Sequence, residues 1–218
     1  LSTMPTLPRL LSTLALATLA PLSAQAFVLV QPNLLVNGSF ELGAWSNTSL
    51  GYMDVPTGST VISGWTTLDN RVAWARTPTG DGVLASDGTF SLDLTGFGNL
   101  SPNAGVTQTI TTVPGAAYTL SFQVDAIPVY GLPVVVQAQA GATSQVFSKS
   151  GAGWQTFSLG FTATGPSTAI TLHGVRQAAT GYVGLDAVSV TAQVPEPGAW
   201  ALMAGGLALL GWRRRRGA

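Results

Sequence analysis

Apolar and polar residues alternate in short runs along the middle of the chain, and this pattern predicts β-strands. In Val106–Thr112, valine, glutamine and isoleucine alternate with threonines. In Tyr118–Val124, large apolar residues alternate with polar ones. Such a period of two residues buries one face of a strand. The Pro114-Gly115 pair between them predicts a turn. No segment between residues 27 and 193 sustains the 3.6-residue period of an amphipathic helix.

Runs of this kind, rich in threonine, valine and serine, recur roughly every ten residues and are separated by glycine and proline. Around eleven short strands in about 165 residues predict an all-β fold, a β-sandwich with jelly-roll topology. The remaining expected strands are Leu34–Val36, Thr60–Trp65, Val72–Arg76, Phe90–Leu94, Val134–Ala140, Gln145–Ser148, Trp154–Phe161, Ala169–Leu172 and Val183–Thr191.

The N-terminus has the three parts of a secretory signal peptide. Arg9 supplies the positive charge, Leu10–Leu22 is apolar, and Ala24-Gln25-Ala26 is a small-x-small cleavage pattern. We therefore expect residues 1–26 to be removed, which leaves Phe27 first; an uncleaved anchor is the alternative. Met4 follows three other residues, so the true start codon stays open.

The C-terminus has an uncharged apolar run, Gly198–Trp212, followed by four arginines. Fifteen helical residues reach about 22 Å, against a bilayer core of roughly 30 Å, so the run predicts a thin transmembrane helix. Basic clusters stay on the cytoplasmic side, which places the preceding chain outside the membrane. The alternative, a buried helix of a soluble domain, fits the tetra-arginine end badly.

Charge and cysteine content exclude several functions. Between residues 27 and 193 eight acids face four bases, a net charge of −4, so nucleic acid is not an expected partner. The chain has no cysteine, which excludes thiol chemistry and zinc–thiolate sites. His173 is the only histidine and lies in a strand pattern, where a structural or surface role is favoured over catalysis. No pair of acids stands out by spacing as the two carboxylates of a glycoside hydrolase.

The tail resembles the PEP-CTERM sorting signal of Gram-negative bacteria that make extracellular polysaccharide. Pro195, Glu196 and Pro197 form the motif (194–197), residues 198–212 the span and residues 213–218 the basic end. The resemblance implies a temporary inner-membrane anchor that is cut near the motif by a membrane protease of the exosortase type. It further implies a final location at the cell surface or in the extracellular matrix.

The body, residues 27–193, carries a second set of motifs. Asn33-Leu34-Leu35-Val36-Asn37-Gly38-Ser39-Phe40-Glu41 opens it, Asp87-Gly88-Thr89-Phe90-Ser91-Leu92-Asp93 follows, and Gly184-Leu185-Asp186-Ala187-Val188-Ser189-Val190 closes it. In this order the motifs resemble the choice-of-anchor C type, galactose-binding-like domain. The resemblance implies a jelly roll similar to carbohydrate-binding modules. It names no ligand, since the fold hosts many functions.

Glu41 and Asp186 are the candidate metal ligands. The first and last strands of such jelly rolls commonly run side by side, which would bring the two carboxylates together. Carboxylate and carbonyl oxygens suit Ca²⁺. Related carbohydrate-binding modules carry a structural calcium at this place; the alternative is that both acids cap or solvate strand ends.

Flat aromatic side chains stack on the apolar faces of sugars, so exposed ones are candidate ligand contacts. Trp45, Tyr52, Trp74 and Tyr130 lie in or beside expected loops or on a charged strand, with ordinary packing as the alternative. Trp65 and Trp154 are expected in the core. Two functions follow: a non-catalytic module that binds extracellular polysaccharide, and a structural matrix or biofilm protein without specific glycan binding. Exposed aromatics beside a groove would favour the first, and small polar residues on both faces the second.

Overall fold

The computed structural model describes residues 31–46, 51–78, 84–95, 103–126, 133–175, 182–193, 205–207, 212–213 and 215. Within these ranges the body is all-β, as the alternation predicts, and its strands belong to one compact unit, Gln31–Ala218. The strands are β1 (Tyr52–Val55), β2 (Thr66–Leu68), β3 (Val72–Arg76), β4 (Phe90–Asp93), β5 (Gly105–Thr111), β6 (Ala117–Ala126), β7 (Val134–Ala140), β8 (Thr143–Lys149), β9 (Gln155–Thr162), β10 (Ser167–Gly174) and β11 (Val183–Ala192).

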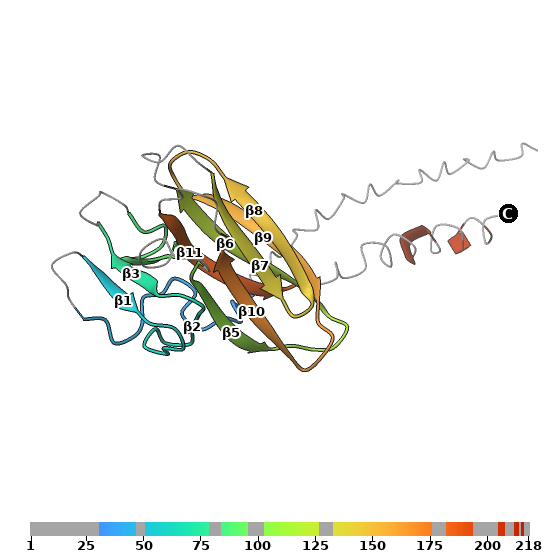
Figure 1. Ribbon diagram of the computed structural model, residues 1–218. Coiled ribbons are helices and arrows are strands. Elements are labelled where there is room, and N and C mark those ends of the chain that lie inside the picture. Colours follow the sequence, from blue (N-terminus) through green and yellow to red (C-terminus); the bar gives the residue numbers. More distant parts are fainter. Residues whose placement is uncertain are drawn as a thin grey trace, which may run out of the picture. The chain divides into compact units, whose positions relative to one another are not determined.

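The strands form two antiparallel sheets. One has six strands in the order β1-β3-β4-β11-β6-β9, and the other has five in the order β2-β5-β10-β7-β8. From β4 onward the chain passes to the opposite sheet at every connection except the β7–β8 hairpin, which is jelly-roll connectivity. Figure 1 shows the long later strands running together, with the short strands β1, β2 and β3 gathered at one end.

The core fills the space between the sheets. β6 alternates strictly, so Leu120, Phe122 and Val124 point inward and are buried, whereas the intervening polar residues face out. Ile170 and Leu172 of β10 meet them from the other sheet. The Pro114-Gly115 turn is confirmed: the Ala116 N–H donates to the Val113 carbonyl at 3.0 Å, and glycine takes the φ of +80° that follows proline in a type II turn.

Two early strand predictions are wrong. Residues 34–36 form no strand, and their contacts to the body run partly through side chains: the Leu35 N–H donates to Asn33 and the Val36 N–H to Gln108. Residues 60–65 make only an isolated bridge, Ile62 to Gly43, and the strand begins one residue after Trp65. β1 was missed, because Tyr52 was assigned to a loop.

β11 carries a bulge that the alternation did not predict. Its pairing with β6 runs from Asp186 opposite Gln123 to Ser189 opposite Ser121, so one extra residue lies between them. Ala187 takes a positive φ of 49° there. Gly38 rests on this bulge, since the Val188 N–H donates to the Gly38 carbonyl at 2.9 Å. The opening and closing motifs of the body therefore meet at the bulge.

Residues 205–207, 212–213 and 215 are helical. Among the described residues no helix has the length and apolar character needed to cross a membrane. Most of the expected span 198–212, the motif residues Pro195, Glu196 and Pro197, and the expected signal peptide 1–26 lie outside the described residues. These remain predictions, as do the domain boundaries 27–193 and 194–218.

Candidate functional site

Glu41 and Asp186 hold the same loop from two ends. Glu41 Oε1 accepts hydrogen bonds from the N–H groups of Thr89 and Phe90, at 2.8 and 2.7 Å. Asp186 Oδ2 accepts from the N–H groups of Ser86 and Asp87, at 2.7 and 3.0 Å. We call residues 84–90 the clasped loop. Both carboxylates thus bind this loop, one at each end, and a shared metal site between them stays a prediction.

Gly88 explains how the clasped loop comes so close to Glu41. It has a φ of +74°, and a Cβ at this position would lie 2.5 Å from the Glu41 carboxyl carbon. Only glycine combines that backbone conformation with the missing side chain. Asp186 lies at the start of the β11 bulge and is fully buried. Its second oxygen, Oδ1, accepts from the Ala187 N–H at 2.6 Å.

The charge of Asp186 is poorly compensated. Burial raises its pKa to about 6, although the N–H groups of Asp87, Ala187 and Ser86 lower it, and the nearby Asp87 carboxylate raises it further. No Lys or Arg among the described residues forms an ion pair with it. A hard cation would supply the missing charge with oxygen ligands of the right type. No group of three acidic or histidine side chains gathers within the described ranges, so a calcium site there would also need backbone carbonyls or water. Calcium stays a prediction.

A second polar cluster lies beside Asp186 on the outward face of the six-stranded sheet. Tyr182 lies against Gly184, whose Cβ would be 2.7 Å from the phenol ring and 3.1 Å from Asp125 Cβ. Burial raises the pKa of Tyr182, and the charges of Asp93, Asp125 and Asp186 raise it further. Asp93 Oδ1 accepts from both Thr95 and the Val183 N–H, although burial raises the pKa of its carboxyl group. These bonds tie β4 to β11.

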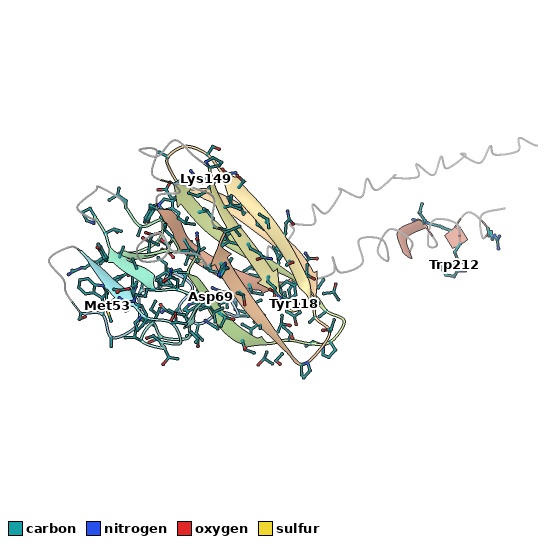
Figure 2. The ribbon with its side chains drawn as sticks, in the orientation of Figure 1. Met53, Asp69, Tyr118, Lys149 and Trp212 are labelled. Carbon is teal, nitrogen blue, oxygen red and sulfur yellow. The ribbon has the colours of Figure 1, made fainter. Side chains whose placement is uncertain are left out.

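Lys149, which Figure 2 places at one end of the sandwich, is the buried base of this region. Its side chain is only 3% exposed, its Nζ lies 3.6 Å from Asp125 Oδ1, and it donates to the Gly151 carbonyl. The pair joins β8 of one sheet to β6 of the other. A buried lysine without such partners would destabilise the fold. The contacts to Asp125 and Gly151 therefore compensate the buried charge of Lys149.

The aromatic candidates for sugar contact differ in how far they are buried. Trp74 is fully buried and donates from Nε1 to the Phe40 carbonyl at 3.0 Å, so its prediction as a sugar contact is wrong. Trp45 is half-buried: its ring contacts Phe90 edge-on at 5.6 Å, and the Arg76 guanidinium lies 5.7 Å from its centroid. Tyr52 is half-buried on β1, and Tyr130 lies outside the described residues.

The two tryptophans expected in the core also differ in burial. Trp65 is confirmed there, with 1% of its surface exposed and its Nε1 bonded to the Asn37 carbonyl at 2.9 Å. Trp154 precedes β9 and is only half-buried. Its Nε1 donates to the Leu84 carbonyl at 2.9 Å. Trp154 thus holds the start of the clasped loop and is a half-exposed aromatic that sequence reasoning placed inside.

The outward face of the five-stranded sheet carries a row of uncharged hydroxyl and amide side chains. Because directly paired residues share a face, the strand registers place one polar side chain from every strand in a single row. At about 4.8 Å per strand the row is about 19 Å long. We call it the polar row: Thr66, Thr107, Thr171, Gln139 and Ser144.

The next row along the same face contains Leu68, Gly105, His173, Gln137 and Val146. His173 lies over Gly105, where a Cβ would be 2.7 Å from the imidazole Cδ2. Its Nε2 lies 2.7 Å from Asp69 Oδ2 without the alignment of a hydrogen bond. The structural or surface position expected for this histidine agrees with the structure. No tryptophan, tyrosine or phenylalanine occupies either row.

Comparison with known proteins identifies both parts of the chain. The family described as "Protein of unknown function (DUF642)" matches residues 33–190, which is most of the chain. The chain belongs to the DUF642 family. The PEP-CTERM protein-sorting motif matches residues 193–216, which confirms the resemblance of the tail. The two-sheet DUF642 body is consistent with the galactose-binding-like fold expected from its motifs.

Several solved structures are similar to this DUF642 chain. The carbohydrate-binding module TmCBM61, solved with β-1,4-galactotriose, is 13% identical, with a TM-score of 0.49 over 74% of this chain and 99% of the module. The cleaved adhesin domain K1 of Lys-gingipain from Porphyromonas gingivalis W83 is 12% identical, with a TM-score of 0.49 over 66% and 99%. A CBM4 structure is 19% identical, with a TM-score of 0.43 over 73% and 99%. These likenesses are too weak to assign a role to any residue. No curated protein sequence matches the chain.

Sequence reasoning missed the polar row of this DUF642 domain, because its members look ordinary one at a time. The signal was present: Thr107, Thr109 and Thr111 alternate with buried residues on β5, and Gln137 and Gln139 do so on β7. Only the register between strands shows that these side chains form one surface. The row contains no aromatic side chain, so the expectation of aromatic sugar contacts did not include it.

Proposed function

We propose that this protein is an exported, exosortase-sorted component of the cell surface or extracellular matrix, whose sandwich binds extracellular polysaccharide without catalysing a reaction. The sorting motif supports export. The polar row supports glycan binding, because side-chain hydroxyls and amides both donate and accept hydrogen bonds, as sugar hydroxyls require. An uncharged row suits a neutral polymer.

The geometry of the polar row fits an extended ligand. Its side chains recur once per strand along a line that crosses the sheet. Part of the row is ordered internally: Thr107 Oγ1 donates to the Ile170 carbonyl at 2.9 Å and lies 3.0 Å from Thr171 Oγ1. Gln139 Nε2 donates to the Gly141 carbonyl at 2.9 Å, which holds its amide in place. Groups held in this way lose little freedom when a ligand binds.

The test is a glycan array followed by titration, with residues 31–193 as the sample. The double variant Thr171→Ala/Gln139→Ala, a directly paired set within the polar row, should bind at least about tenfold more weakly, since it removes several hydrogen bonds of about 1 kcal/mol each. The matched control is Ser121→Ala/Ser158→Ala, a directly paired set on the outward face of the other sheet. It should bind as the unmodified protein does.

Two results would redirect the proposal. Full binding by the Thr171→Ala/Gln139→Ala variant would exclude the polar row and leave the aromatic candidates Trp45, Tyr52 and Tyr130 to be tested in the same way. Absence of binding to every glycan, including the host polysaccharide, would favour the structural matrix role. The small polar residues on the outward face of the five-stranded sheet support that second candidate, because no aromatic side chain occupies the two rows described above.

A further inference from the structure

One side of the sandwich ends in two edge strands that carry almost no charge. Among the strands that the structure describes, β8 and β9 each end a sheet, and they lie side by side, in yellow and orange in Figure 1. β8 has seven residues and β9 has eight, with no proline and no charge except Lys149. Lys149 is buried against Asp125, so it does not shield the edge.

The opposite edges are protected in the usual ways. β1 has only four residues and carries Asp54, which forms an ion pair with Arg71 at 2.5 Å. β2 has only three residues and is followed directly by Asp69. Short edge strands and charged side chains prevent a second chain from adding to a sheet. The contrast singles out the β8 and β9 side as open to pairing.

We propose that β8 pairs antiparallel with β8 of a second copy of this chain, about a two-fold axis near Val146. Unpaired backbone N–H and C=O groups at the free edge of β8 would complete a ladder across the axis. Val146 is 55% exposed, and its side chain would lie against the same residue of the second copy. The outward faces of the two five-stranded sheets, with their polar rows, would then become continuous.

The charge distribution selects a second copy as the occupant. An edge that pairs with itself opposes each charge to a like charge, which is unfavourable. β8 is neutral from Thr143 to Ser148, so self-pairing there has no such penalty. The partly exposed carboxylates of Asp54 and Asp69 lie at the opposite edges, where self-pairing would bring like charges together. Pairing through β8 requires no glycan, so its failure would leave the binding proposal untouched.

The experiment is analytical ultracentrifugation of residues 31–193 over a wide range of protein concentration. This piece contains every strand and the whole buried core, and can therefore fold by itself. The unmodified protein should form dimers as concentration rises. Val146→Lys should remain a monomer, because a two-fold pair would place two lysines face to face. Mixing Val146→Lys with Val146→Glu should restore a dimer that contains one of each.

The matched control is Ala169→Lys, which adds the same charge at an exposed position on β10, a central strand of the same sheet. It should form dimers like the unmodified protein. Ser144→Lys, also exposed on β8, provides a second edge variant if Val146→Lys melts at a lower temperature. A monomer at every concentration, dimerisation of both lysine edge variants, or failure of the opposite charges to restore a dimer would overturn the proposal.

Discussion

Asp186 couples the stability of the domain to pH. Its pKa is raised to about 6 in the folded protein, mainly by burial, from 3.8. Between these two values the folded state keeps a proton that the unfolded chain has lost. The stabilisation is complete below about pH 4 and is lost as pH rises through about 6, because the ionised group is then buried at a cost.

The prediction is that this single group lowers the free energy of unfolding by roughly 3 kcal/mol as pH rises from about 4 to about 6, in the absence of divalent cations. Denaturant titration across that range measures it. Asp186→Asn should flatten this part of the curve, since its side chain cannot ionise. An equally steep fall in the variant would assign the dependence to other groups, of which Asp93 is the nearest candidate.

Calcium would reverse the same dependence if Glu41 and Asp186 hold it. A bound divalent cation favours the ionised carboxylates and stabilises the folded state by mass action. Calcium should therefore raise the melting temperature at neutral pH, and the increase should shrink in Glu41→Ala and Asp186→Ala. A melting temperature that does not respond to calcium or to chelator, in any of the three proteins, would exclude the site.

Among single residues, the motifs in the sequence identified important side chains better than they predicted which side chains are buried. The core position of Trp65 was predictable from its motif, and the motifs also singled out Glu41 and Asp186, which bind opposite ends of the clasped loop. The burial of Trp74 was not, because Arg71 and Arg76 near it suggested an exposed strand. The alternation did indicate burial, because Trp74 lies two residues after the buried Val72 and therefore on the same face of the strand, between two alanines. Size and position in the alternation outweigh nearby charges.

At the scale of elements, every strand from β3 to β11 was predicted to within about two residues by its own alternation. The early segments failed for a physical reason: residues 34–36 and 60–65 are held largely by side chains and turns rather than by ladders. Asn33 shows this, since its amide accepts from the N–H groups of Leu35 and Val190 and donates to the Val188 carbonyl. The two-residue alternation of apolar and polar residues cannot predict contacts of this kind, because they are made by single side chains.

The contact between the opening motif and the bulge gives a prediction at this scale. A Cβ on Gly38 would lie 1.9 Å from the Val188 carbonyl oxygen, so Gly38→Ala should separate the N-terminal segment from β11. We expect a loss of about 1–3 kcal/mol in the free energy of unfolding. Gly160→Ala is the control, because nothing lies within 4 Å of its added methyl group on β9. Equal effects of the two changes would contradict this account.

For the whole molecule, the two ends of the chain are predicted to decide its location. Export should begin with the signal peptide and leave Phe27 first, and residues 198–212 should halt translocation until the protease acts. From the sequence, Pro195 and Pro197 are predicted to disfavour a helix here and so to present Glu196 in an extended form to the protease.

Replacing Pro195, Glu196 and Pro197 by alanines in the native host should leave an uncleaved, membrane-bound precursor. Cell fractionation and the intact mass of the protein measure this. A substitution outside residues 193–216, Thr162→Ala at an exposed position of β9, should be processed normally. Release of the triple-alanine protein at the unmodified rate would show that the motif does not direct cleavage.

The position of β11 within its sheet also bears on how the protein withstands force. The tail follows β11 in the sequence, so tension on the predicted membrane anchor would enter the body through this strand. β11 is not an edge: β6 flanks it on one side and β4 on the other. Asn33 and Gly38 fasten it further at the bulge. A pull along β11 must break these bonds in shear, many at once, rather than peel them one by one. The central place of β11 therefore favours a domain that would stay folded under tension from the predicted anchor.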